Sequence, residues 1–309
     1  MRGGAGVAAL WLLVACEAGL PTSKIPQPRP DGSGVPVVAV QPTSPESAEL
    51  RSYLLQVQTA QLSQGLLRTD GGGPDTPFTA DMLAQNFEDV VFYNEYASAL
   101  QGRGGQSPLR RWDGPVRFGT IFGNSVPPSQ RSRDTADVRE YARRLGRISG
   151  HPISSFGAPN FVVVFASEDD RLAALDAAAA RVTGVTRESL KPLEDLSRDT
   201  YCVVAAYASA REASTYSAAV ALIRAENPSL LRLACVHEEL AQGLGLANDS
   251  LTARPSIFND DDEFALLTSH DELLLKMLYD PRLKPGMSAA DAAPVTRIIA
   301  RELTSSEPL

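Results

Sequence analysis

The chain has 309 residues, and its 29 Lys and Arg against 37 Asp and Glu give a formal net charge of −8. This acidic balance argues against a nucleic-acid binder, which holds phosphates with clustered Lys and Arg. Only three Cys and three His are present, which excludes zinc fingers and cysteine-rich scaffolds. The 43% hydrophobic fraction is ordinary for one large or two small domains with a buried core.

The first fifteen residues predict a signal peptide. Arg2 precedes an uncharged apolar run over residues 5–15, which is too short to cross a bilayer but has the length of a secretory signal core. Residues 13–16 read LVAC and resemble the lipobox of bacterial lipoproteins. The resemblance implies cleavage before Cys16 and a lipid on its sulfur, which would anchor the chain on the periplasmic side of a bacterial cell envelope. An ordinary signal peptide with a chance Cys is the alternative.

A tether is expected after the lipid anchor, over residues 16–46. Seven prolines lie between Glu17 and Pro45, with Gly, Ser and Thr among them. Because proline removes amide donors and favours extended geometry, this segment predicts a semi-stiff spacer. The folded part begins at about Ser47.

The folded part alternates helical and strand patterns. Apolar periodicity predicts helices at about 47–62, 79–100, 134–148, 169–182 and 228–246. Alternating or continuous apolar runs predict strands at 116–122, 160–165, 201–207 and 216–223, the last two as a hairpin. The run at 160–165 is apolar throughout, which is typical of a strand buried on both faces.

The helix at 228–246 contains the candidate site. His237 lies on its apolar stripe, which favours a hydrogen-bonded core histidine over a metal ligand. Glu238 and Gln242 are four residues apart and share one face, so their side chains can bind the same ion or chemical group. The pattern fails as HExxH when it starts at His237, because Ala241 stands where the second His belongs.

Shifted by one residue, the segment from Glu238 to Asn248 has the spacing of the metzincin motif HExxHxxGxxH. This resemblance places Glu239 at the catalytic Glu and Gly245 at the turn glycine. The three metal-ligand positions are then occupied by Glu238, Gln242 and Asn248. Downstream, residues 256–259 resemble the metzincin Met-turn with Phe in the Met position, and residues 267–279 resemble its C-terminal helix, although Thr268 and Asp271 also form a capping pair.

Four longer segments make the resemblance more specific: GLLRTD at 65–70, EELAQGLGLAND at 238–249, SIFNDD at 256–261 and LYDPRLKPGMS at 278–288. They resemble an uncharacterised bacterial envelope family catalogued as domain of unknown function 2927, over about residues 47–303. That family supplies no established activity. The more distant zincin resemblance implies an α+β fold: a metzincin-like subdomain at 47–247, with long helices and a mixed, mostly antiparallel-edged sheet, and a small helical C-terminal subdomain at 248–309.

The replaced ligands argue against zinc, which prefers His nitrogen and Cys sulfur, so no metal or other cofactor is expected. Three interpretations remain open. In the first, the domain is a pseudopeptidase without catalysis, which binds a peptide or an envelope protein or acts as a scaffold. In the second, it is an atypical hydrolase with Glu239 as general base. In the third, oxygen ligands hold calcium, with Asp249 and Asp260–Asp262 nearby. The predicted binding cluster is Glu238, Gln242, Asn248 and Asp249, and Glu239 is the candidate catalytic residue.

Cys202 and Cys235 remain once Cys16 is assigned to the anchor. Outside the cytoplasm two thiols that can meet usually oxidise, so a disulfide is predicted. Two separately buried free thiols are the alternative.

Overall fold

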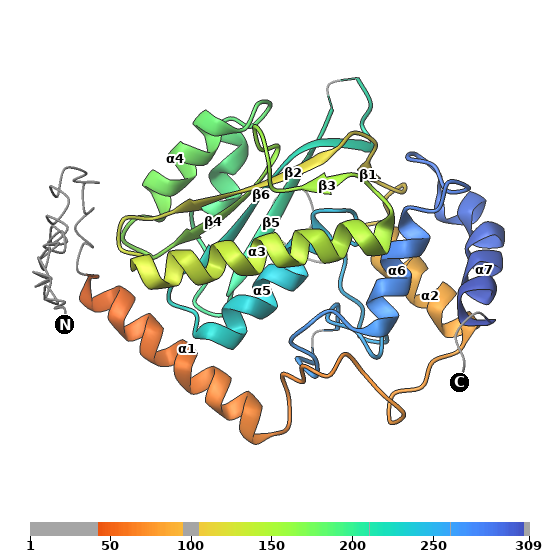
Figure 1. The fold of residues 1–309 in the computed structure, drawn as a ribbon, viewed down its shortest axis with the longest axis horizontal. Helices are drawn as coiled ribbons and strands as arrows, with labels where there is room; N and C mark the ends of the chain where they lie inside the picture. The colour runs from red at the N-terminus through yellow and green to blue at the C-terminus, as the bar shows by residue number, and fades with distance from the viewer. Residues whose placement is uncertain (1–42, 95–104, 210, 260, 306–309) are drawn as a thin grey trace, which may run out of the picture. The chain divides into compact units, whose positions relative to one another are not determined.

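A six-stranded sheet runs through the middle of the domain in the computed structural model (Figure 1). The structure describes residues 43–94, 105–209, 211–259 and 261–305. The predicted signal peptide, Cys16 and nearly all of the tether lie outside these residues. None of the helices in the described ranges combines the length and apolarity needed to cross a bilayer.

Helices and strands alternate along the chain, as the sequence predicts. The helices are α1 (Pro45–Ser63), α2 (Ala80–Val91), α3 (Pro128–Ser149), α4 (Arg171–Arg181), the 3₁₀ helix η1 (Glu188–Leu193), α5 (Ser229–Gln242), α6 (Ser269–Leu278) and α7 (Ala289–Ser305). The strands are β1 (Arg111–Trp112), β2 (Val116–Phe122), β3 (Ile153–Ser154), β4 (Phe161–Ala166), β5 (Cys202–Ala208) and β6 (Thr215–Arg224).

The sheet is mostly parallel, so the predicted antiparallel-edged sheet is wrong. The strand order is β1-β6-β4-β2-β3, with every neighbouring pair parallel, and β5 pairs with β6 in addition. The β5–β6 hairpin is confirmed as the one antiparallel pairing among the described strands. The reason lies in the connections: helix α3 follows β2 and returns the chain for a parallel β4, whereas the short turn after β5 permits only an antiparallel partner.

Alternate residues of the central strands enter two different cores. In β4, Phe161, Val163 and Phe165 join the larger core with α2, α3, α5 and α6, whereas Val162 and Val164 join the smaller core with α4. Figure 1 shows α3 and α5 on one side of the sheet and α4 on the other. The prediction that this strand is buried on both faces is therefore confirmed.

The larger core also combines α5 with the C-terminal helices. It includes Leu240 of α5, Leu274 of α6 and Ile299 of α7, all at most 2% exposed. The subdomain boundary at residue 247 stays a prediction.

Helix α3 begins earlier than its sequence pattern predicts. The apolar pattern begins at Asp134, but the helix starts at Pro128 and Asp134 lies inside it, 2% exposed. Its Oδ1 accepts a 2.7 Å hydrogen bond from Nε of Arg232, itself buried on α5. The polar residue is thus half of a buried ion pair that joins α3 to α5.

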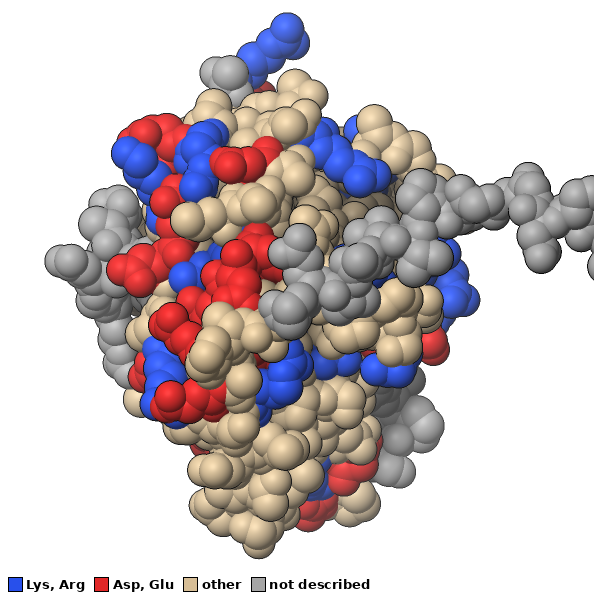
Figure 2. All heavy atoms as spheres, turned by 90° about the vertical axis from the view of Figure 1, so that its left-hand side faces the viewer, with Lys and Arg blue, Asp and Glu red and all other residues tan. Residues whose placement is uncertain are grey.

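Acidic and basic side chains are interspersed on the face that Figure 2 shows. Charged side chains of the described residues also form pairs: Arg187, for example, contacts both Asp176 and Glu194. Exposed pairs of this kind contribute little stability individually.

Candidate functional site

Helix α5 is held in place at its C-terminal end by a buried Trp112 and a half-buried Tyr279. The indole Nε1 of Trp112 donates to the Gly243 carbonyl at 2.8 Å, and the Tyr279 hydroxyl donates to the Leu244 carbonyl at 3.0 Å. These bonds satisfy carbonyls that the helix leaves without an intrahelical partner. Gly245 follows with φ +126°, so the chain turns away from the helix there.

His237 is a core residue, as predicted. Its ring stacks on Tyr141 with 4.0 Å between centroids, and its Nδ1 accepts a hydrogen bond from the Leu267 amide at 3.0 Å. Burial lowers the pKa of His237 to about 3. The ring is therefore neutral at pH 7 and supports α5 against the loop that leads into α6.

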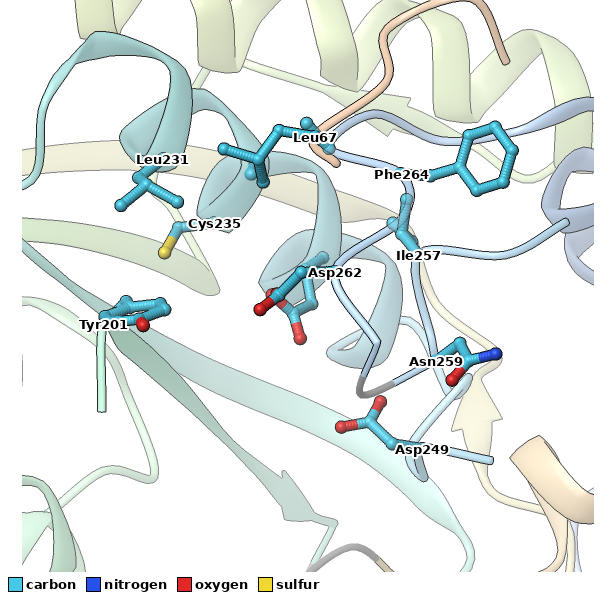
Figure 3. A pocket seen from close by; sticks show the side chains of 12 residues that line it. Leu67, Tyr201, Leu231, Cys235, Asp249, Ile257, Asn259, Asp262 and Phe264 are labelled. Atoms are coloured by element: carbon cyan, nitrogen blue, oxygen red, sulfur yellow. The ribbon is translucent and has the colours of Figure 1, made fainter. Parts of the chain in front are cut away.

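A cavity of about 160 Å³ opens beside α5 (Figure 3). One part of its wall is apolar and another is acidic or polar. The apolar part comprises Leu67, Leu231, Ala234, Ile257, Phe264 and Ala265; the remaining lining residues are Tyr201, Cys235, Glu238, Asp249, Asn259 and Asp262. The lining thus joins α5 to the loop before α6, the residue before β5 and the segment after α1.

The predicted binding cluster is brought together only in part. Glu238 and Asp249 line the cavity. Gln242 lies next to them, 5% exposed, and its Nε2 donates to Asp249 Oδ1 at 3.2 Å. Asn248 instead faces α2, where its side-chain Nδ2 donates to the Asp89 carbonyl at 2.8 Å and its backbone N–H donates to the carbonyl of Val90.

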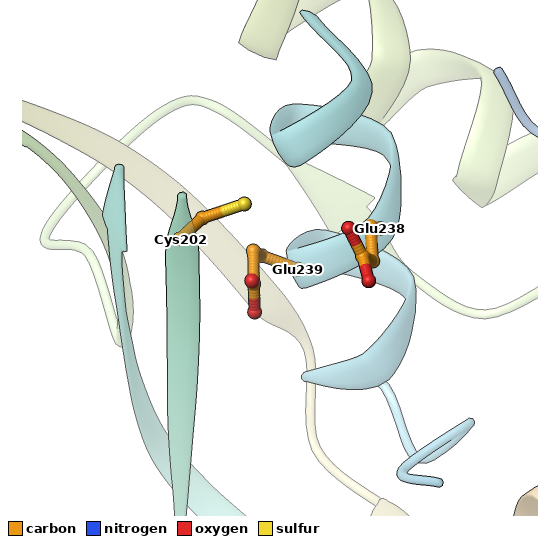
Figure 4. Close-up of side chains that lie close together, drawn as sticks. All are labelled: Cys202, Glu238 and Glu239. Carbon is orange, nitrogen blue, oxygen red and sulfur yellow. The ribbon is translucent and has the colours of Figure 1, made fainter. Parts of the chain in front are cut away.

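Glu239, the tentative catalytic residue, lies on the sheet side of α5. Its side chain is 3% exposed, and it is not among the described residues that line the cavity. Figure 4 shows Glu239 and Cys202 in the space between α5 and β5, with Glu238 nearby. One carboxylate oxygen from each Glu and the Cys202 sulfur lie within 4.8 Å of one another.

The predicted disulfide is present. Cys202 and Cys235 are bonded, with 5.9 Å between their Cα atoms and 33 positions between them in the sequence. The bond joins the first residue of β5 to the middle of α5. Since Cys235 also lines the cavity, the disulfide forms part of its wall.

The turn at 256–258 is fixed by one buried carboxylate. Asp271 accepts hydrogen bonds from Ser256 Oγ at 2.6 Å and from the Ile257 amide at 3.0 Å. It also forms the predicted capping box with Thr268 at the start of α6. The same residue therefore begins α6 and positions the Ile257 wall of the cavity.

Side chains of the acidic segment at 261–263 contact other parts of the domain. Asp262 lines the cavity and accepts a 2.7 Å hydrogen bond from Gln61 of α1. Glu263 pairs with Arg254 and Arg68, and the Arg254 guanidinium lowers the pKa of Glu263. Asp260 lies outside the described residues.

The sequence does not single out eight of the lining residues as site residues, among them Leu67, Tyr201 and Asn259. Leu67 and Asn259 lie inside the conspicuous segments at 65–70 and 256–261, which is a signal that points to them. Tyr201 lies in a predicted strand and has no comparable signal.

These observations define an α+β domain with a small, partly acidic cavity at the junction of a disulfide-linked strand and helix. A model of the family described as "Protein of unknown function (DUF2927)" matches residues 80–298, and the chain belongs to that family. The predicted family is thereby confirmed. No curated protein and no solved structure matches the chain.

Proposed function

We propose that this chain is a lipid-anchored envelope protein whose domain is a zinc-free, metallopeptidase-like module that binds an extended peptide segment. The anchor is Cys16, reached through the proline-rich tether, and the environment is the periplasmic side of a bacterial membrane. The bound peptide is either a segment of an envelope protein or a separate peptide. The domain holds it without cleaving it.

The order of parts around the cavity supports the metallopeptidase-like relation. Strand β5, antiparallel to β6, lies two elements before α5, and the chain turns at Gly245, three residues after α5 ends, where the long motif requires a turn. The turn at 256–258 and helix α6 follow, tied together by Asp271. At the motif's ligand positions, however, Asn248 is engaged with Asp89 and Gln242 with Asp249, and neither supplies the imidazole that zinc prefers.

The observation that carries the proposal is the position of the cavity at the head of β5. Among the described strands β5 pairs only with β6, so its other edge presents backbone groups that an extended peptide can match. Tyr201, immediately before β5, lines the cavity. A peptide laid along β5 therefore reaches the cavity, where apolar walls suit a side-chain stem and Glu238, Asp249 and Asp262 suit a basic end.

The hydrolase alternative has less support because of Glu239. A general base has to come within hydrogen-bond reach of water or substrate. Glu239 is 3% exposed, is not among the described residues that line the cavity, and lies between strand and helix. Peptide binding needs no such access.

A peptide-display library tests the binding proposal with the mature protein under non-reducing conditions. Ala234 lines the cavity from α5, so Ala234→Phe fills it; Ala177→Phe, on the exposed side of α4, is the matched control. We expect selected peptides to bind wild type and Ala177→Phe equally, and Ala234→Phe at least ~10-fold more weakly. Equal binding to all three proteins would contradict a role for the cavity.

Metal analysis and mass spectrometry of the library test the alternatives. Stoichiometric zinc in the oxidised protein would overturn the zinc-free proposal, and stoichiometric calcium would favour the oxygen-ligand interpretation. Peptide cleavage that Glu239→Gln abolishes would favour the hydrolase.

Labelling with fatty acid tests the lipid anchor. Cys16→Ser should abolish incorporation of labelled fatty acid, whereas the double variant Cys202→Ser/Cys235→Ser should keep it. Label retained in Cys16→Ser would refute the anchor.

A further inference from the structure

The disulfide lies directly beside two carboxylates. Cys202 Sγ, one oxygen of Glu238 and one oxygen of Glu239 are all within 4.8 Å of one another. Cys235 Sγ is bonded to Cys202 Sγ and therefore lies next to this group of three donors. The Cys202 sulfur and the two carboxylates thus lie close together between β5 and α5 (Figure 4), and the Cys235 sulfur is bonded to Cys202.

The backbone arrangement of this group is rigid. Cys235, Glu238 and Glu239 are separated by three and four positions on α5, the spacing that brings helical side chains onto one side. Cys202 approaches from the first position of β5. In addition, Nδ2 of the buried Asn227 donates to Cys235 Sγ at 3.7 Å, and such a donor stabilises a thiolate.

We propose that opening this disulfide creates a zinc site, with Cys202, Cys235, Glu238 and Glu239 as the four ligands. A dithiol reductant supplies two electrons and two protons; the Cys202–Cys235 bond breaks, two thiols form, and the reductant becomes a disulfide. Zn²⁺ then displaces the two thiol protons to solvent, because only the thiolate is a ligand. In the oxidised chain the sulfur atoms are bonded to each other and the site does not exist.

The distances and charges suit a tetrahedral ion. Zinc bonds of about 2.3 Å to sulfur and 2.0 Å to oxygen place the donors roughly 3.3–3.8 Å apart. The donors of Cys202, Glu238 and Glu239, already within 4.8 Å of one another, need to close by about 1–1.5 Å through side-chain rotation. Cys235 Sγ, once released from its bond to Cys202, has to rotate into the fourth position. Two thiolates and two carboxylates together carry four negative charges, and a divalent cation relieves their repulsion. Cys235 and Glu238 also line the cavity, which gives the ion a path from solvent.

This site is independent of peptide binding, since the proposed function concerns the oxidised protein and the zinc site only the reduced one. The test uses the mature chain, either oxidised or reduced with excess small dithiol and desalted without air. Zinc affinity is measured by competition with a chromogenic chelator. We expect one equivalent of zinc bound at least ~100-fold more tightly by the reduced chain, and thiolate-to-cobalt charge-transfer absorption when Co²⁺ replaces Zn²⁺.

The double variant Glu238→Gln/Glu239→Gln keeps both cysteines and should bind zinc at least ~10-fold more weakly after reduction. Glu140→Gln, an exposed carboxylate on α3, is the matched control and should bind as wild type does. Wild-type affinity in the double variant would show that thiols alone hold the ion and would overturn the four-ligand site. Equal affinity of oxidised and reduced protein, or a reduced chain that unfolds and does not regain its circular dichroism with zinc, would overturn it as well.

Discussion

Gly245 is a residue that no other amino acid replaces without strain. Its φ of +126° is a conformation that side chains disfavour, and a Cβ there would lie 2.4 Å from the Arg110 carbonyl oxygen. We expect Gly245→Ala to lower the free energy of unfolding by at least ~2 kcal/mol in urea denaturation. Gly114→Ala, where a Cβ meets nothing within 4 Å, should change it by less than ~1 kcal/mol. Equal effects would contradict the steric argument.

His237 makes stability depend on pH in a definite direction. Burial lowers its pKa from 6.5 to about 3, so below pH 6.5 the unfolded chain takes up a proton that the folded chain excludes. Its stabilising contribution is complete above pH 6.5 and is lost as pH falls towards 3. Between pH 7 and 4.5 we expect wild type to lose about 2–3 kcal/mol more than His237→Gln does, measured by urea unfolding of both proteins at both pH values. Equal losses would show that His237 does not titrate this way.

At the residue scale, the sequence identifies residues of a given chemical type, but not whether each side chain is buried or lines the cavity. The metzincin-like spacing correctly locates Gly245 at a turn, because backbone geometry selects glycine there. It does not reveal that Glu239 is buried while Glu238 lines the cavity. Adjacent helical residues point about 100° apart, and which of the two faces the sheet depends on how the whole helix packs.

Helix α6 depends on a buried capping box that an exposed helix start matches closely. Asp271 is fully buried and also accepts hydrogen bonds from Ser256 and Ile257, whereas Asp291 at the start of α7 is exposed and accepts one from Ser288. We expect Asp271→Ala to cost about 3 kcal/mol, because three buried donors lose their acceptor, and Asp291→Ala less than ~1 kcal/mol. Thermal denaturation of both variants measures the difference. Similar costs would mean that the buried contacts add nothing to the cap.

At the element scale, continuous patterns are predictable and long-range pairings are not. The strand at Phe161–Ala166 and the helix at Ser229–Gln242 follow from apolar runs that need no partner to be recognised. The two-residue strand β1 has no such run. Its Arg111 is buried, and its guanidinium donates to the carbonyl of Leu278 at the end of α6 and, at 3.0 Å, to that of Leu283 in the turn that follows. These partners lie far along the chain, so no local pattern reveals them.

The parallel sheet is a property of the whole molecule that strand patterns alone do not fix. The same apolar run serves a parallel or an antiparallel partner, and the choice depends on whether a helix or a tight turn connects the strands. For this reason the β5–β6 hairpin is predictable from two runs close in sequence, and the parallel neighbours of β4 are not. The lining of the cavity is hard to predict for the same reason, because Tyr201 lines it only as a result of where β5 lies in the sheet.

Within the described chain the disulfide is the one covalent bond between side chains that joins the sheet to α5, so its loss should lower the stability of the whole domain. It closes a loop of 33 positions, which in the loop-entropy model stabilises the folded state by about 3–4 kcal/mol. We expect Cys202→Ser/Cys235→Ser to unfold in one transition, with Tm lowered by roughly 5–15 °C in calorimetry. Cys16→Ser should leave Tm unchanged, because its sulfur takes no part in this bond. A double variant as stable as wild type would mean that the packing of α5 on β5 and β6 stabilises the fold without the covalent link. The disulfide would then add little to the free energy of unfolding.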